Sequence, residues 1–593
     1  MNPKLIKFFH AATPSAQLVA DPQALQLSAL KRGFIIHPDI LNETVRAFVD
    51  AETIDPNATF YRTWEDVVSK DRFTLFWDQI LHYASTYGTE FSGPAYVPNE
   101  GAEAPDFTKY TVISPISEED LFLRCRRLLY AGAALKSDTV ALLCEECVAA
   151  VRAGRGEIDL DAVKNREALA VLSLALDRRP SDPVNLLRYI VYAATRETLL
   201  IRSDALLGKI KLRADNFDFN TLSQKDLERL ASIFYRFKPL FLAFRGPKNR
   251  TVINRIRRMA PRFHRPLVPG FWESLLSVRP PVETVEARLG EISDFKLAAL
   301  LQTVRERLLS AEETDPKSLY LVRNGKVFIA PSKIRPDAAA VSYWKTLAER
   351  LEARLIANLS AKACNVRFPE ELRLTCPTSE KNFIGNLPFG AHYPMKGHNF
   401  FGIYWRNAWG THDFDLSFVD WQGLKTGWNE AYNTGATVYS GDMTDADPEA
   451  AEVMYCKDTC PDGTIYCNRY HGEDGSRFRF YFGQEEIVEL TRSYMVSPDA
   501  MAVNEEVVSD SKQKMLGIIC GGNIYLMDLG VGNRRVSDDV GAGEKEKIFL
   551  RKSRAFLDLK DILLRAGFIE SEAPELDLTK LEKDSLLRLF SPQ

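Results

Sequence analysis

The spacing of apolar residues along the sequence changes near residue 367, and this change limits the fold more than any other feature of the sequence. From about residue 18 to 310, apolar residues recur with the period of an amphipathic helix, as in "EEDLFLRCRRLLYAGAAL". From about 367 to 553 they form short alternating runs of aromatic and β-branched residues, such as "NFFGIYWRN" and "FRFYFG". We therefore expect an α+β multidomain protein, with an irregular α-helical N-terminal half before an antiparallel β-sandwich.

Smaller signals divide the chain of 593 residues further. The Gly- and Pro-rich stretch "SGPAYVPNEGAEAPDFTKYTVISP" indicates a loop or linker, and Asn324-Gly325 between two β-rich runs predicts a hairpin. The tail returns to amphipathic helix in "SRAFLDLKDILLRAGF". The predicted parts are an N-terminal helical region (1–91), a loop or linker (92–115), an α-helical domain (116–315), a hairpin with a long helix (316–366), the sandwich (367–553) and C-terminal helices (554–593).

Charge and cysteine content exclude some classes of protein. A net charge of -4 argues against a globally basic nucleic-acid binder, although a local basic patch can still act. The sequence has neither a signal-peptide pattern nor an apolar run long enough for a transmembrane segment. Nine cysteines, an odd count, do not suggest a disulfide framework. We expect a cytoplasmic protein with free thiols.

Two acidic segments suggest a cation site. In "HDFDLS", Asp413 and Asp415 lie two positions apart on a predicted strand, so their carboxylates share a face and repel unless something positive lies between them. The segment "VYSGDMTDADPEAAE" follows within about 40 residues, and hard cations such as Ca²⁺ prefer this kind of oxygen donor. The alternative is that the aspartates cap a turn and solvate a strand end. The candidate ligands are Asp413, Asp415, Asp442, Thr444, Asp445 and Glu452.

The order of D-F-D-L-S, a strand and Y-S-G-D-M-T resembles the TerD domain of bacterial tellurite-resistance and stress-response proteins. The resemblance implies a β-sandwich with Ca²⁺ sites built from these two motifs. The segments "NRIRRMAPRFHRPLVPGFWESLLS", "YLVRNGKVFIAPS" and "KMLGIICGGNIYLMDL" are similar to larger TerD-related proteins, in which a long helical region precedes the sandwich. The resemblance therefore implies a non-enzymatic stress-response scaffold that interacts with protein partners, such as other stress-response components. One departure is "TDADPEAAE", where Pro448 and three alanines dilute the charge and predict weaker cation affinity.

The segment 236–265 is strongly basic and contains neither Asp nor Glu. Arginine binds phosphates and carboxylates with bidentate geometry, so RNA, other polyanions, anionic lipid or an acidic partner are candidate ligands. Nucleic-acid or polyanion binding is therefore the alternative function. Equally, the patch can pair internally with acidic helices such as "PVETVEARLGEISD". The candidate residues are Arg250, Arg255, Arg257, Arg258, Arg262 and Arg265.

Other reactive residues carry weaker signals. Structural zinc sites usually have four nitrogen or sulfur ligands, and Cys456, Cys460, Cys467 and His471 are residues of the right types. Their spacing, however, departs from that of common zinc motifs. Burial as small hydrophobic residues is the alternative. Cys144 and Cys147, three residues apart within a predicted helix, fit core packing better than a redox pair.

No phosphate loop, nucleophile elbow, zinc-protease motif or dinucleotide fingerprint occurs in the sequence. A histidine next to an aspartate can act as a general base, so a hydrolase stays open as a further alternative, with His392, His398 and His412 as its candidates.

Overall fold

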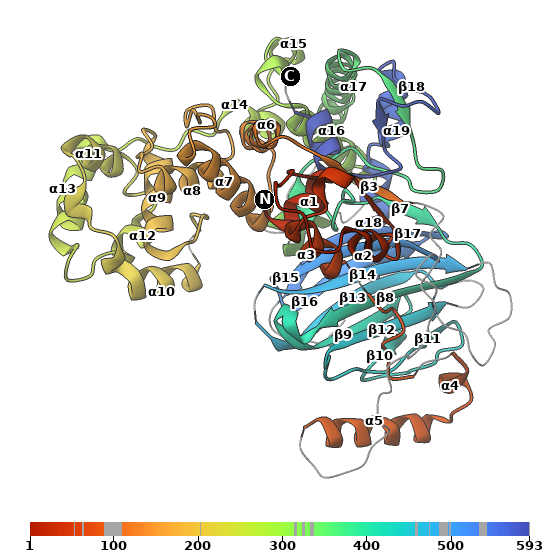
Figure 1. Ribbon diagram of the computed structural model, residues 1–593. Helices are drawn as coiled ribbons and strands as arrows, with labels where there is room; N and C mark the ends of the chain where they lie inside the picture. Colours follow the sequence, from red (N-terminus) through yellow and green to blue (C-terminus); the bar gives the residue numbers. More distant parts are fainter. Residues whose placement is uncertain are drawn as a thin grey trace. The chain divides into compact units, whose positions relative to one another are not determined.

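The computed structural model describes residues 1–52, 54–61, 64–87, 110–201, 203–313, 317–322, 326–331, 337–456, 460–473, 475–485, 496, 500–532 and 542–591. Helices lie mostly in the N-terminal half and strands mostly in the C-terminal half, which confirms the mixed α+β class (Figure 1). The chain forms two compact units: unit 1 combines Met1–Pro115 with Asp294–Phe590, and unit 2 contains Ile116–Ser293. Unit 2 is thus inserted into the sequence of unit 1.

Two antiparallel sheets form the centre of unit 1 (Figure 1). One has the strand order β10-β9-β13-β16-β17-β7 and the other β11-β12-β8-β14-β15. The strands are β7 His392–Pro394, β8 His398–Arg406, β9 Thr411–Asp420, β10 Lys425–Gly427, β11 Thr437–Tyr439, β12 Glu449–Cys456, β13 Gly463–Gly472, β14 Ser476–Glu485, β15 Met501–Ser509, β16 Gln513–Cys520 and β17 Asn523–Gly532. This arrangement confirms the predicted β-sandwich character. The strands of the two sheets span residues 392–532 of the predicted range 367–553, and helix α18 (Ala542–Ala555) begins before that range ends.

Aromatic side chains join the two sheets. The ring centroids of Trp405 on β8 and Phe414 on β9 lie 5.9 Å apart, and those of Phe414 and Phe478 on β14 lie 4.9 Å apart. Side chains alternate across a strand, so Phe414 and its neighbours Asp413 and Asp415 leave β9 on opposite sides. The inward position of Phe414 therefore sets the direction of both aspartates.

The first 115 residues belong to unit 1 rather than to a separate helical region. Strands β1 (Ala11–Ala12), β3 (Thr111–Pro115) and β2 (Phe34–Ile36) form a parallel sheet in this order. Helices α1 (Pro3–Phe9), α2 (Pro22–Leu30) and α3 (Glu43–Ala51) accompany it, around a core that includes Ile6, Phe48 and Ile113. Strand β3 occupies the end of the predicted loop or linker 92–115. Most of that prediction, residues 92–109, lies outside the described residues.

The remainder of unit 1 contains helices and short strands. Helix α16 (Asp294–Ser310) packs with α17 (Ala338–Ser360), so the predicted helical domain 116–315 runs past the unit boundary at residue 294. Strands β4 (Lys317–Val322) and β5 (Lys326–Pro331) pair antiparallel, while the predicted turn Asn324-Gly325 lies outside the described residues. The other elements are β6 Asn365–Arg367, α18 Ala542–Ala555, α19 Leu559–Arg565, β18 Ile569–Glu570, β19 Leu576–Asp577 and α20 Lys583–Leu589.

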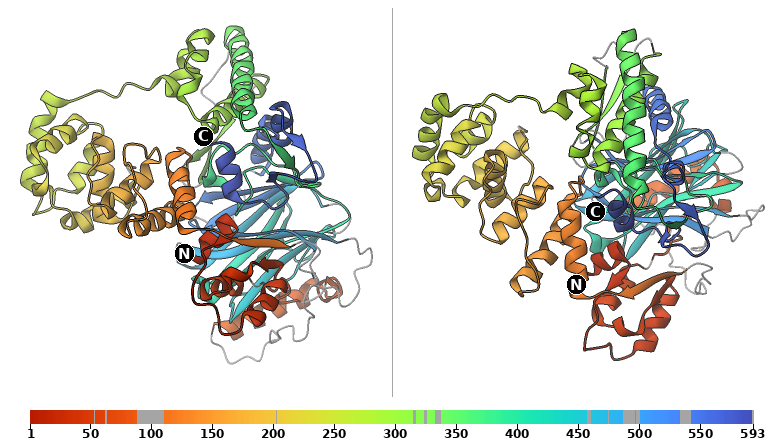
Figure 2. Two further views of the ribbon diagram at one scale, coloured as in Figure 1. Left: turned by 45° about the horizontal axis from the view of Figure 1, so that its top comes forward. Right: turned by 90° about the horizontal axis from the view of Figure 1, so that it is seen from above.

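Unit 2 is an all-helical array, coloured orange to yellow-green in Figure 2. A core that includes Leu187, Ile190, Phe219, Phe241 and Ile256 joins its central helices. None of the helices in the described part of the chain combines the length and apolar character needed to cross a bilayer. The helices of unit 2 are α6 Glu118–Tyr130, α7 Ser137–Arg152, α8 Arg166–Ala175, α9 Pro183–Thr195, α10 Asp204–Arg213, α11 Gln224–Ser232, α12 Lys238–Ala243, α13 Arg250–Phe263, α14 Phe271–Val278 and α15 Val282–Glu286.

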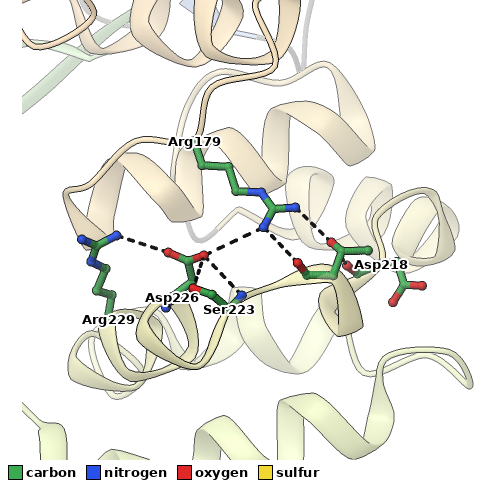
Figure 3. Close-up of polar contacts among 6 residues, drawn as sticks. Arg179, Asp218, Ser223, Asp226 and Arg229 are labelled. Atoms are coloured by element: carbon green, nitrogen blue, oxygen red, sulfur yellow. Dashed lines mark hydrogen bonds and ion pairs between the residues drawn. The ribbon is translucent and has the colours of Figure 1, made fainter.

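A polar contact fixes the start of α11. Ser223 and Asp226 form a capping box, each satisfying a backbone N–H of the first turn. Figure 3 shows the Asp226 carboxylate between Arg179 and Arg229, whose Nη1 lies 3.2 Å from Oδ1 of Asp226. Arg179 also donates to the backbone oxygen of Thr221 at 2.9 Å. The acidic side chain of this helix start is therefore already paired.

Candidate metal centre

Three aspartates from two segments meet in unit 1. Strand β9 supplies Asp413 and Asp415, and the loop after β11 supplies Asp442. One carboxylate oxygen from each lies within 4.8 Å of the other two, and the three residues are 2%, 2% and 0% exposed. Among the described residues, these three aspartates are the group of His, Cys, Asp or Glu side chains whose ligand atoms lie close enough together to share an ion. The geometry joins the two acidic motifs of the sequence.

A glycine turn brings Asp442 to this position. Gly441 has a φ of 93°, a conformation that side chains disfavour. A Cβ atom there would lie 2.9 Å from ring atoms of Phe60 and Tyr61. Ser440 fixes the same turn to β12, because its Oγ accepts a hydrogen bond of 2.8 Å from the backbone N–H of Val453. The Ser-Gly-Asp sequence is therefore a structural requirement of the centre.

Each aspartate has one oxygen without a hydrogen-bond donor among the described residues: Oδ1 of Asp413, Oδ2 of Asp415 and Oδ1 of Asp442. A buried polar atom left in this state costs about 1–3 kcal/mol, and more when it is charged. Oxygen ligands bind Ca²⁺ at about 2.3–2.6 Å, so three carboxylates that bring one oxygen each within 4.8 Å of the others can reach a single ion. The donor set fits a hard cation.

The electrostatics of the centre also favour a positive ligand. Burial, followed by the charge of Asp442, raises the pKa of Asp413 to about 8. Burial raises the pKa of Asp442 to about 6, and burial together with the neighbouring carboxylates raises the pKa of Asp415 well above its usual value. Protons and a cation therefore compete for these oxygens.

The other three predicted ligands lie outside this trio. The carboxylate of Glu452 accepts backbone N–H bonds from Leu416 at 2.6 Å and from Met443 at 3.0 Å, which connects β12 to both acidic segments. The hydroxyl of Thr444 lies 3.0 Å from Nε2 of His82. Asp445 is exposed and accepts a hydrogen bond of 2.9 Å from Asn407. The centre thus contains three of the six predicted residues.

Sequence reasoning missed a second set of residues, which lie on α5 (Arg72–Thr86) and just after it. Figure 1 shows α5 below the sandwich, near β10 and β11. Oδ2 of Asp442 accepts hydrogen bonds from the Tyr83 hydroxyl at 2.6 Å and from Nε2 of Gln79 at 3.1 Å. Oδ2 of Asp413 accepts one from the Tyr87 hydroxyl at 3.1 Å. The available signal was the spacing of four residues between these polar side chains, which places them on one helix face.

The cysteine series does not form a comparable group among the described residues. Cys456 lies on β12 and Cys467 on β13, which belong to different sheets. Sγ of Cys456 is 2.7 Å from Sγ of Cys460. Cys144 and Cys147 are buried in α7.

The three histidines have separate surroundings. The His392 ring stacks on Tyr525 at 4.6 Å, and burial lowers its pKa. His398 begins β8, and the side chain of His412 lies outside the described residues. No shared arrangement of the three is seen in the described part of the chain.

The six arginines predicted to bind polyanions lie on α13 and just beyond it in unit 2, and all six are exposed. None of them forms an ion pair with a described residue; Arg255 donates a hydrogen bond to the neutral side chain of Gln224. The nearby acidic residues pair elsewhere, Asp226 with Arg179 and Arg229, and Asp218 with Lys248 at 3.7 Å. Within the described part of unit 2, Lys248 of the basic segment is therefore paired with an acidic residue, whereas the six predicted arginines are not.

Comparison of the chain with protein-family models, with curated proteins and with solved structures finds no match.

Proposed function

We propose that unit 1 binds a hard divalent cation through Asp413, Asp415 and Asp442, with Ca²⁺ as the first candidate. The observation that carries the proposal is the meeting of three buried carboxylates, each with an oxygen that lacks a donor among the described residues. Carboxylate oxygens are the ligands that Ca²⁺ and Mg²⁺ prefer. A cation there offsets the repulsion among the three charges.

The expected consequence is mechanical rather than catalytic. A cation held by β9 and by the loop after β11 connects two segments of different sheets and stiffens this edge of the sandwich. Three carboxylates are fewer than the six to eight oxygen ligands that Ca²⁺ takes, so backbone oxygens or water would complete the shell. We therefore expect moderate affinity.

The resemblance to TerD domains supplies the biological context of this proposal. It rests on the two acidic motifs, which occur in the same order as in that family. On this basis we propose a cytoplasmic, non-enzymatic stress-response scaffold whose partners are other proteins of the same response. The exposed helices of unit 2 offer it a large surface for interaction.

Calorimetric titration of the full chain with Ca²⁺, Mg²⁺ and Zn²⁺ tests cation binding. We expect saturable binding of Ca²⁺ and a rise in melting temperature, since a ligand present at 100 times its dissociation constant stabilises the folded state by about 2.7 kcal/mol. The variant Asp413→Asn with Asp415→Asn should lose both effects. Asp445→Asn removes an exposed acid outside the trio and should keep them. Equal behaviour of the two variants would refute the assigned ligands.

A second candidate function is polyanion binding by unit 2. The observation in its favour is that the six exposed arginines, Arg250, Arg255, Arg257, Arg258, Arg262 and Arg265, form no ion pair with a described residue. Such a surface attracts phosphate groups and releases counterions when it binds them. Binding to single-stranded RNA should therefore weaken steeply as salt is added, and binding that does not respond to salt would exclude this function.

A further inference from the structure

Helix α5, which is part of unit 1, directs its polar side toward the acidic loop after β11. Gln79 and His82 are 8% and 9% exposed, whereas Phe73 and Phe76 are 68% and 59% exposed. An amphipathic helix on a globular protein ordinarily has the opposite orientation, with apolar residues on the core. The buried residues of α5 are Leu75, Gln79 and His82, so hydrophobic burial contributes less to the attachment of this helix than is usual.

Hydrogen bonds to the aspartates take its place. Tyr83 and Gln79 both donate to Oδ2 of Asp442, and Tyr87 donates to Oδ2 of Asp413. In each carboxylate, the oxygen without a donor among the described residues is the other one, Oδ1. The α5 segment thus holds one oxygen of each carboxylate and leaves its partner oxygen for another ligand.

Thr444 adds a further connection between this helix and the acidic loop. Its hydroxyl lies 3.0 Å from Nε2 of His82 and 2.9 Å from Oγ1 of Thr86. The contacts of α5 with the loop therefore extend over about two turns of the helix, from Gln79 to Thr86. They fix the orientation of the whole face.

We infer that Gln79, Tyr83 and Tyr87 are positioning residues for the cation ligands, and that cation binding and the attachment of α5 stabilise each other. The inference rests on the cation binding proposed above. It extends that proposal to residues more than 300 positions away in the sequence.

The chemistry of the donors supports this coupling. Hydroxyl and amide groups orient a carboxylate without neutralising its charge, so the three negative charges remain available to a cation. Hydrogen bonds to ionised acceptors are stronger than those between neutral groups, and a cation keeps the carboxylates ionised. Groups that orient metal ligands typically change metal affinity by about 10–100-fold when they are removed.

The coupling is reciprocal. If attachment of α5 raises the affinity for the cation by some factor, the bound cation raises the equilibrium constant for docking of α5 on the sandwich by the same factor. Two measurements on one protein therefore test a single quantity. Neither depends on a biological activity.

The first measurement is Ca²⁺ titration of Tyr83→Phe in the full chain. This variant keeps the ring and removes the hydroxyl that donates to Asp442, so we expect its affinity for Ca²⁺ to fall about tenfold. Tyr235→Phe, which makes the same change at an exposed tyrosine of unit 2, is the matched control and should bind as the wild type does. If Tyr83→Phe does not fold, Tyr87→Phe provides the same test at a residue that is 57% exposed.

The second measurement is hydrogen exchange of residues 72–86 with and without Ca²⁺. We expect slower exchange in the presence of Ca²⁺ for the wild type and a smaller change for Tyr83→Phe. If Ca²⁺ binds the wild type but neither its affinity for Tyr83→Phe nor exchange in α5 changes, the inference is wrong and cation binding still stands. If Ca²⁺, Mg²⁺ and Zn²⁺ all fail to bind the wild type, both are wrong.

Discussion

Nη2 of Arg479 lies 2.7 Å from Oε2 of Glu52, with the arginine side chain 1% exposed and the glutamate side chain 10% exposed. Nζ of Lys7 reaches the same oxygen at 3.1 Å. Burial by itself opposes ionisation of Glu52, but the attraction of Arg479 and Lys7 outweighs it and lowers the pKa of this carboxyl to about 2. The pair connects the end of α3 to β14 inside unit 1.

The pair predicts a pH-dependent contribution to stability. Because the pKa of Glu52 is lower in the folded state than its usual 4.5, its ionised form stabilises the fold above about pH 4.5, and this stabilisation is lost as the pH falls toward 2. Glu52→Gln should cost about 3 kcal/mol at pH 7 and progressively less at pH 4 and pH 3. Urea unfolding of both proteins at each pH measures the difference.

Glu43→Gln is the matched control for this experiment. Glu43 pairs with Arg46 at 3.4 Å, with side chains 70% and 40% exposed. An exposed pair of this kind contributes about 0.2–1 kcal/mol at most. A pH-independent cost for Glu52→Gln would show that the ion pair does not determine the stability of this contact.

Asp415→Asn should change stability in opposite directions with and without a cation. Burial and the neighbouring carboxylates raise the pKa of Asp415 well above its usual value, so its charged form destabilises the cation-free protein. At pH 8 without cation, Asn at this position should raise the melting temperature. With saturating Ca²⁺ the order should reverse, because the variant lacks a ligand. Thermal unfolding in chelator and in Ca²⁺ measures both, and a lower melting temperature in chelator would contradict the repulsion.

Gly441→Ala should destabilise unit 1 and weaken the cation response. Its φ of 93° strains any side chain, and a Cβ would lie 2.9 Å from ring atoms of Phe60 and Tyr61. The control is Gly435→Ala, where φ is 85° but no atom lies within 4 Å of the new Cβ. Gly435→Ala should cost about 1 kcal/mol from the backbone alone. Gly441→Ala should cost more, and it should also reduce the Ca²⁺-dependent shift, unlike its control.

Neutral replacements on α13 test polyanion binding. Arg255→Gln, Arg257→Gln and Arg258→Gln together remove three exposed charges. For every phosphate of a single strand that the variant no longer binds, the slope of log K against log salt should become shallower by about 0.7. Arg166→Gln, Arg178→Gln and Arg213→Gln remove the same charge elsewhere in unit 2 and serve as the control. Fluorescence anisotropy with labelled RNA measures the slopes. Equal slopes for both triple variants would indicate non-specific attraction.

Local patterns in the sequence predict much of this fold. The alternation of "DFDLSFVDW" predicts β9, because one side of the strand meets the aromatic core and the other does not. The leucines at Leu347, Leu351, Leu355 and Leu359 recur every fourth residue and predict α17, where all four are buried. The return of residues 1–115 to the sandwich unit was not predictable, since it depends on contacts between distant segments that leave no local period. One example is the backbone hydrogen bond of 2.8 Å that the N–H of Tyr61 donates to the carbonyl of Ser440.

The same distinction applies to the candidate centre. The two-residue spacing of Asp413 and Asp415 on a predicted strand indicates that they share a face, and Asp442 belongs to the Ser-Gly-Asp turn motif. Gln79, Tyr83 and Tyr87 belong to a segment more than 300 residues earlier. The sequence of that helix alone predicts that its apolar face, and not its polar face, packs against a core. Glu452 shows the reverse: an acidic residue near two motifs suggests a ligand, but backbone N–H groups occupy its carboxylate.

The insertion of residues 116–293 between the two segments of unit 1 has a consequence for synthesis on the ribosome. The helical insert is translated long before the strands of the sandwich, so it can fold before the segments of unit 1 that contact residues 1–115 have been synthesised. During that interval Gln79, Tyr83 and Tyr87 lack their partners Asp442 and Asp413, which are translated more than 300 residues later. The attachment of α5 to the acidic loop is therefore a late, post-insert step of folding.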